Sequence, residues 1–317
     1  MITIPSGWTL FIILYLYFLE LAGGAYIFST VTDFSGDERR KVIARLAAYL
    51  SFIAAILGVV FVALDVRLQL VRFLNMFTTA TSIMTWGTVF IFVFLAPVII
   101  TVLAWLSYKE DKIGIFLMKI PIIRWIIDLF KLNRQQRLTV EIAGSFMAIL
   151  AVGYAGVLLC SMASRPFWYT QILFWVLFVA TLSDGVVGTG VMTALASRLS
   201  PTSEKVPIPV LKGLESIDTP LLIITTALIA SLLTLTNAPT QIHAILVGGL
   251  MLPFWIGVVG IGIILPLILV VYIRRLEKKT THDSATVNRL MLITFSLVLI
   301  GALLLRYVLI IAGQVIG

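Results

Sequence analysis

The chain has 317 residues, of which 60% are hydrophobic and only 12% are charged, and its mean hydropathy is +1.10. Because no soluble domain of this length can hide so much apolar surface from water, the composition excludes a water-soluble protein and indicates one that folds in a bilayer. The formal net charge of +8 is typical either of nucleic-acid binding or of the basic loops that orient a membrane protein.

Eight apolar runs are long enough to cross a membrane, since a helix needs roughly 20 apolar residues to span about 30 Å of hydrocarbon. The first run follows MITIPSGW, which has no basic residue, and is too long for a cleaved signal peptide, so we expect it in the mature protein. The sequence predicts an all-α integral membrane protein, with residues 1–317 forming a single transmembrane domain. Its eight transmembrane helices are expected at residues 8–31, 42–65, 86–107, 139–161, 168–194, 219–236, 242–272 and 290–313.

The lysines and arginines gather in alternate loops. Nineteen of the 23 lie between the first and second, third and fourth, fifth and sixth, or seventh and eighth runs, when Arg45 at the start of the second run is included. The other loops contain Arg67, Arg72 and Arg165, and Arg306 lies within the last run. Because basic loops stay in the cytoplasm, this split predicts a multi-pass protein of the cytoplasmic membrane with both termini non-cytoplasmic. It also accounts for the net charge, so the lipid bilayer is an expected partner and nucleic acid is not.

The longest loop, at about residues 108–138, contains KIGIFLMKIPIIRWIIDLFK, which mixes apolar and basic residues around Pro121. Such a mixture is typical of one or two helices that lie in the interface on the cytoplasmic surface. The alternative is a ninth span, which would invert every later loop and destroy the charge asymmetry.

Glu20 is the first ionisable residue at membrane depth. It lies about 18 Å along the first run, close to the midplane, at roughly 1.5 Å per residue. In YFLELAGGAY it shares a helix face with Tyr17 and Gly24. Gly23 and Gly24 allow close approach either of another helix or of a flat ligand. An acid at this depth is costly unless it is paired or faces a wet cavity, so Glu20 is either half of a structural ion pair or part of a site.

Three later runs also contain polar residues. In the fourth run Tyr154, flanked by Gly153 and Gly156, is either an anchor at the membrane interface or part of a site. Asp184 lies in TLSDGVVGTG, in the inner half of the fifth run. The last run contains LLLRYVLIIAGQ, in which Arg306 needs an acidic partner such as Glu20 or Asp65.

Cysteine and histidine usage limits the cofactors. Cys160 is the only cysteine, which excludes a disulfide within the chain and an all-cysteine metal site. A b-type heme between membrane helices usually needs histidine ligands within the membrane. His282 lies in a charged loop and His243 stands alone at the mouth of the seventh run. We therefore expect no heme and no metal in this chain.

Four segments, in order along the chain, resemble the NrfD/polysulfide reductase membrane-subunit family. They are LDVRLQLVRFLNMF at 64–77, SIMTWG at 82–87, YAGVLL at 154–159 and the RYVLIIAGQ that begins at Arg306. The resemblance implies a heme-free subunit that handles a menaquinone-like quinone. It also implies an iron–sulfur partner of the four-cluster ferredoxin type, and often a molybdopterin catalytic subunit.

The same resemblance assigns roles to residues. Tyr154 matches the family tyrosine that hydrogen-bonds a quinone, and Glu20 corresponds to a polar position of the first helix. The segment 66–85 falls on the predicted non-cytoplasmic side, where the iron–sulfur subunit of such proteins docks. The residues expected at that interface are Asp65, Arg67, Arg72, Asn75 and Trp86.

The leading hypothesis is a subunit without a redox centre of its own that exchanges electrons between the quinone and the iron–sulfur partner on the outer face. Tyr154, Glu20 and Arg306 would bind the quinone, and Glu20 and Asp184 would relay protons. One alternative is a secondary transporter that uses the intramembrane glutamate, aspartate and arginine, with glycine-rich breaks such as SDGVVGTG in its helices. Another is a passive anchor for an extracytoplasmic enzyme.

Overall fold

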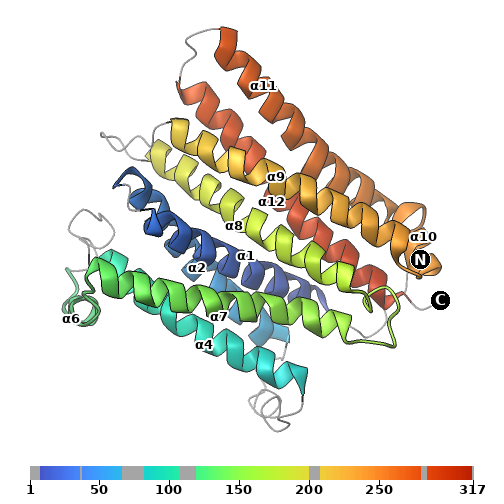
Figure 1. The fold of residues 1–317 in the computed structure, drawn as a ribbon, viewed down its shortest axis with the longest axis horizontal. Helices are drawn as coiled ribbons and strands as arrows, with labels where there is room; N and C mark the ends of the chain where they lie inside the picture. The colour runs from blue at the N-terminus through green and yellow to red at the C-terminus, as the bar shows by residue number, and fades with distance from the viewer. Residues whose placement is uncertain are drawn as a thin grey trace.

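The computed structural model describes residues 8–35, 38–65, 82–107, 119–199, 208–279 and 284–315. All regular structure in these ranges is helical (Figure 1). The elements are α1 (Leu10–Phe34), α2 (Glu38–Asp65), α4 (Ile83–Leu106), α6 (Pro121–Leu129), α7 (Arg134–Cys160), α8 (Gln171–Leu199), α9 (Ile208–Leu235), α10 (Pro239–Leu246), the π-helix η1 (Pro253–Ile264), α11 (Leu265–Lys279) and α12 (Ser284–Gln314).

Eight helical spans in the described ranges are long and apolar enough to cross a membrane, and η1 and α11 together form one of them. The prediction of an all-α protein with eight spans is therefore confirmed. The sixth span begins at Ile208 rather than near residue 219. Glu215 and Asp218 end the apolar run in the sequence, yet both are buried inside the helix. The seventh run is divided, because α10 precedes it and Pro253 starts the π-helix.

The predicted interfacial segment is described from residue 119 onward. Pro121 lies in the first turn of α6, where a proline costs no hydrogen bond, rather than in the middle of a helix. The α7 helix already begins at Arg134, after Asn133 and Gln136 form a reciprocal capping box. The first part of the segment, residues 108–118, lies outside the described residues.

The bundle has a buried centre and two flanks. The spans of α1, α8 and α12 are the most buried, and α1 contacts α2, α7, α8 and α12. In Figure 1, α4 and α7 lie on one side of this centre, and α9 and α11 on the other. Both chain ends lie at one end of the bundle and α6 at the opposite end. The Trp8 backbone N–H donates to Gln314 Oε1 at 3.0 Å, which joins the two terminal helices.

The close approach of α1 and α8 places the site. A side chain at Gly24 would collide with the Thr181 carbonyl and with Gly185, and one at Gly185 would collide with Gly24. The two helix backbones therefore touch, as small residues permit in membrane bundles. Of the two expectations for Gly24, helix packing is confirmed. This contact brings Glu20 of α1 and Asp184 of α8 within reach of a single side chain.

Candidate functional site

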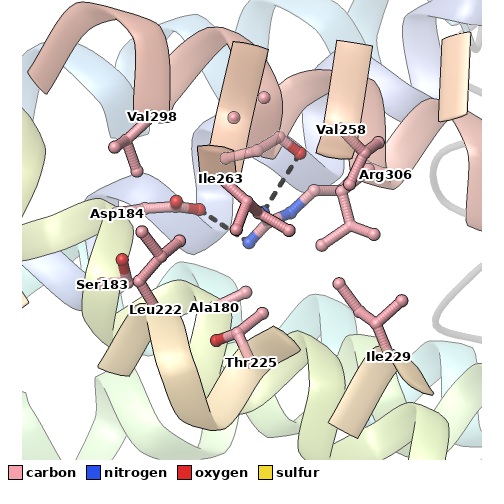
Figure 2. Close-up of a pocket in the computed structure, with 14 residues that line it drawn as sticks. Ala180, Ser183, Asp184, Leu222, Thr225, Ile229, Val258, Ile263, Val298 and Arg306 are labelled. Atoms are coloured by element: carbon pink, nitrogen blue, oxygen red, sulfur yellow. Dashed lines mark hydrogen bonds and ion pairs between the residues drawn. The ribbon is translucent and has the colours of Figure 1, made fainter. Parts of the chain in front are cut away.

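Arg306 is the centre of a buried ion cluster formed by three helices. Its side chain on α12 is 0% exposed, and its Nη2 lies 2.7 Å from Glu20 Oε2 and 2.6 Å from Asp184 Oδ2. Its Nε also donates to Glu20 Oε2 at 2.7 Å, and its Nη1 donates to the Ala302 carbonyl at 3.1 Å. Figure 2 shows the contacts of Arg306 with Asp184 and with the carbonyl. We call Glu20, Asp184 and Arg306 the Arg306 cluster.

The prediction of acidic partners for Arg306 is confirmed in part. Glu20 is one partner, as predicted, and the second is Asp184, which the sequence suggested only as a separate relay residue. Asp65 is not a partner; at the end of α2 it accepts a hydrogen bond from the Thr9 hydroxyl. The reason is that the α1–α8 contact places two acids beside Arg306, and they take up its Nε and Nη2.

Three further side chains surround the cluster. The Tyr17 ring centroid lies 5.9 Å from Arg306 Cζ, and the Tyr17 hydroxyl donates to the Leu299 carbonyl at 3.3 Å. The Thr181 side chain lies within hydrogen-bonding reach of Glu20. Tyr15 lies within electrostatic range of both Glu20 and Tyr154. Tyr17 and Thr181 share helix faces with the acids in the sequence, whereas Tyr15 has no such spacing and was missed.

A small cavity lies beside the cluster, between α8, α9, η1 and α12. Its volume is about 30 Å³, which is enough for one or two water molecules. Among its mainly apolar lining, the polar side chains are Ser183, Asp184, Thr225 and Arg306 (Figure 2). The Thr225 hydroxyl is buried and has no hydrogen-bond partner among the residues that the structure describes. The cavity therefore has polar groups on the side that faces the Arg306 cluster and can hold a hydrogen-bonded water molecule.

Polar contacts continue from the cavity toward the cytoplasmic end predicted by the basic loops. The Ser183 hydroxyl donates to Asp218 Oδ1 at 2.5 Å, and Asp218 is 6% exposed. One turn earlier on α9, Glu215 Oε1 lies 2.7 Å from Arg274 Nη2, whose side chain is 54% exposed. The sequence reading missed Asp218 and Glu215, because it placed both in a loop before the sixth span.

Tyr154 lies outside the ion cluster. It is half-buried on α7, and its ring packs directly against Gly87 of α4. Tyr15 is the residue that connects Tyr154 electrostatically with Glu20. The structure thus joins Glu20, Asp184 and Arg306 by direct contacts and places Tyr154 at the α4–α7 contact.

A larger groove opens where α7 ends and α8 begins. Its volume is about 660 Å³, within the usual range for small-molecule sites. Val157 and Ser161 contribute to it from α7, on the helix face that begins with Tyr154, and Phe174 and Trp175 contribute from α8. The groove is therefore lined both by aromatic and aliphatic side chains and by the polar side chains of Ser161, Thr170 and Gln171.

The residues expected at the partner interface are described only in part. Asp65 ends α2, and Trp86 is exposed in the first turn of α4. Arg67, Arg72 and Asn75 lie outside the described residues, so that interface stays a prediction. Within the described ranges, no group of three or more histidine, cysteine, aspartate and glutamate residues is arranged to hold a metal ion.

Comparisons with known proteins identify the family of this chain. The sequence matches the family described as Polysulphide reductase, NrfD, over residues 4–317. It is 24% identical over 298 residues to the C subunit of the selenate reductase of Mesobacillus selenatarsenatis, a match that spans 85% of this protein and 67% of the relative. It is 25% identical over 313 residues to the C component of the polysulfide reductase of Wolinella succinogenes, a match that spans 96% of this protein and 93% of the relative. The resemblance found in the sequence motifs is confirmed, and the chain belongs to the NrfD polysulphide reductase family of membrane proteins.

Proposed function

We propose that this protein is the quinone-binding membrane subunit of a multi-subunit oxidoreductase of the polysulfide or selenate reductase type. It exchanges electrons between a menaquinone-like quinone and an iron–sulfur subunit of the four-cluster ferredoxin type. The terminal reaction takes place in a molybdopterin subunit. Both relatives are named as one lettered component of a reductase, which supports the role of one subunit among several.

The observation that carries this proposal is the Arg306 cluster, in which a buried cation holds two carboxyl groups inside the bundle. Tyr15 lies within electrostatic range of both Glu20 and Tyr154. A quinone supplies two-electron redox chemistry, and its turnover also needs protons. The residues present fit such a ligand, because α1 and α7 supply a buried carboxyl group and a half-buried tyrosine, and α7 and α8 form a groove with aromatic side chains. Tyr154 donates to a ring carbonyl, Glu20 holds a proton near it, and Arg306 fixes the position of Glu20.

Asp184 and Glu20 form the proposed proton relay. Two carboxyl groups share one guanidinium, and a buried net charge is costly, so one of the acids is best kept protonated. Because Arg306 Nη2 contacts both acids, the proton can reside on either Glu20 or Asp184 while the other carboxylate stays paired with Arg306. The cavity next to Asp184 and the Ser183–Asp218 hydrogen bond give this relay a polar route toward the basic end.

The proposed topology follows from the basic loops. Both termini lie on the non-cytoplasmic side of the cell membrane, and α6 lies on its cytoplasmic surface. Residues 1–317 form one transmembrane domain. The iron–sulfur partner docks at the outer end through Asp65, Arg67, Arg72, Asn75 and Trp86. The protein binds no heme and no metal of its own, so electrons pass directly between quinone and partner.

The two alternatives fit less well. A transporter would also place ionisable residues at membrane depth, but α8 runs unbroken from Gln171 to Leu199 through the glycine-rich SDGVVGTG. A passive anchor would not need a buried cluster of three ionisable side chains, each of which is costly in a bilayer.

The test of the proposal is Tyr154→Phe in the intact complex. This variant removes one hydroxyl donor and keeps the ring against Gly87, so assembly should survive. Quinol-linked turnover should fall on the order of ten- to a thousandfold, as for loss of a donor at a reacting carbonyl. When an artificial electron donor reduces the partner subunits directly, the variant complex should turn over at the wild-type rate.

Tyr272→Phe is the matched control, because Tyr272 lies exposed on α11, away from the cluster. Full quinol-linked turnover in Tyr154→Phe, with normal assembly, would remove Tyr154 from the site. A protein that isolates without any iron–sulfur partner would favour the transporter instead.

A further inference from the structure

A second buried ion cluster lies at the other end of α1, separate from the proposed quinone site. Asp33, in the last turn of α1, and Arg137 and Glu141, in the first turns of α7, all have side chains that are 0% exposed. Arg137 Nη2 donates to Asp33 Oδ2 at 2.8 Å and to Oδ1 at 3.0 Å, and its Nε donates to Oδ2 at 3.1 Å. We call these three residues the Arg137 cluster.

Glu141 has a different environment from Asp33. Its Oε1 lies 3.7 Å from Arg137 Nε, which is too long for a hydrogen bond. Neither of its carboxyl oxygens has a hydrogen-bond partner among the residues in the described ranges. Its carboxyl group is also close enough to Asp33 for the two acids to interact. An ionised Glu141 would therefore be buried beside a second carboxylate, with the indole N–H of Trp105 as the donor within its reach.

Among the residues that the structure describes, no second buried cation lies beside Glu141. From α4, Trp105 lies with its ring 3.8 Å from Arg137 Cζ, and Ile127 of α6 packs in the same apolar cluster as Trp105. From α1, Tyr26 lies within electrostatic range of Glu141. Arg134 of α7 is exposed, and its Nη2 approaches the Asp33 carbonyl oxygen at 3.4 Å. Among these neighbours the buried cation is Arg137, whose charge is balanced by Asp33.

From this geometry we infer that the Arg137 cluster is a proton-binding site, in which Glu141 holds the proton as a neutral carboxylic acid. Neutral Glu141 avoids a buried net negative charge, and its O–H becomes a donor that can reach the Asp33 carboxylate. The proton exchanges with the water at the start of α7, since Glu141 lies about 10 Å along the helix from Arg134. This inference concerns a site apart from the Arg306 cluster and does not rest on the proposed function.

The test is infrared spectroscopy of the full-length protein at neutral pH, in the region where the C=O of a protonated carboxyl group absorbs. Glu141→Gln keeps the size and neutrality of the acid, so the variant should keep the wild-type melting temperature and lose one band that shifts in D₂O. The control is Asp128→Asn, because Asp128 is an exposed residue of α6 that pairs with Arg124 and Lys131, so this variant should leave the protonated-carboxyl region unchanged. Loss of an ionised-carboxylate band instead, with the protonated region unchanged, would overturn the inference.

Asp33→Asn provides a second, independent variant. Without the Asp33 charge, Glu141 becomes the counter-ion of Arg137 and should release its proton, so the same band should disappear. The protonated acid of the Arg306 cluster should keep its own band in both variants. If neither Glu141→Gln nor Asp33→Asn removes a band from the protonated-carboxyl region of the wild type, the inference is overturned.

Discussion

The two buried ion clusters have the same composition but different geometry. Each contains one arginine and two acids, and each takes one acid from α1. In the Arg306 cluster the guanidinium touches both acids, at 2.7 and 2.6 Å, and the three residues come from three helices beside a polar cavity. In the Arg137 cluster the guanidinium is bound to Asp33 and lies 3.7 Å from Glu141, beneath Trp105. A shared arginine suits the transfer of a proton between acids, whereas a closed pair with a neutral acid suits proton storage and helix packing.

The largest expected effect is that of Arg306→Ala. The variant leaves Glu20 and Asp184 buried without their cation, and breaking a buried ion pair in this way costs about 3–5 kcal/mol of stability. Quinol-linked turnover should be abolished even in complexes that assemble. Thermal unfolding in detergent and turnover per assembled complex measure the two effects separately. Arg306→Lys should recover part of the stability but less of the turnover, because one ammonium cannot reproduce the contacts of Nε and Nη2 with two acids.

Arg137→Ala separates stability from function. It breaks a buried pair of the same kind, so the loss of stability should again be about 3–5 kcal/mol. Turnover per assembled complex should stay at the wild-type level, because Asp33 lies about 20 Å along α1 from Glu20 of the proposed quinone site. If Arg137→Ala abolishes turnover as Arg306→Ala does, the two clusters act as one unit and the comparison fails.

Much of the Arg306 cluster was predictable from the sequence. An unpaired charge inside an apolar run has a high free-energy cost in a bilayer, which drew attention to Glu20, Asp184 and Arg306. The pairing of Glu20 with Arg306 was predicted for the same reason. The second pairing depends on the Gly24–Gly185 contact between α1 and α8, which sequence spacing does not specify.

The Arg137 cluster was missed for a related reason. Arg137 belongs to the basic loops in a hydropathy reading, and Asp33 and Glu141 lie just outside or at the edge of the predicted spans. The same boundary effect hid Glu215 and Asp218, because a helix that buries its acids continues past the point where the apolar run ends. The order of the spans could be predicted from hydropathy. Whether a charged residue near the end of a span is buried depends on tertiary contacts, which hydropathy does not give.

The same substitution at one glutamate of each cluster should have a smaller effect on turnover than Arg306→Ala but should separate the two clusters more clearly. Glu20→Gln removes a proton carrier from the proposed quinone site and keeps its shape, so turnover should fall on the order of a hundredfold or more. Glu141→Gln mimics an acid that is already neutral, so turnover should be unchanged. The measurement is quinol-linked turnover in H₂O and D₂O, and the solvent isotope effect should rise only in Glu20→Gln. Equal rates in both variants would show that Glu20 does not take part in the proton-coupled step.

The last prediction assigns the two ends of the bundle to the two sides of the membrane. Cysteines are introduced singly at exposed positions in a Cys160→Ala background: Asp128→Cys on α6, near the Arg137 cluster, and Ser161→Cys at the opposite end, where α7 finishes. A reagent that does not cross membranes should label Ser161→Cys in intact cells and Asp128→Cys only in inverted vesicles, because the basic loops place α6 in the cytoplasm. Labelling of Asp128→Cys from outside would reverse the topology, and the water that serves Glu141 would then be extracytoplasmic.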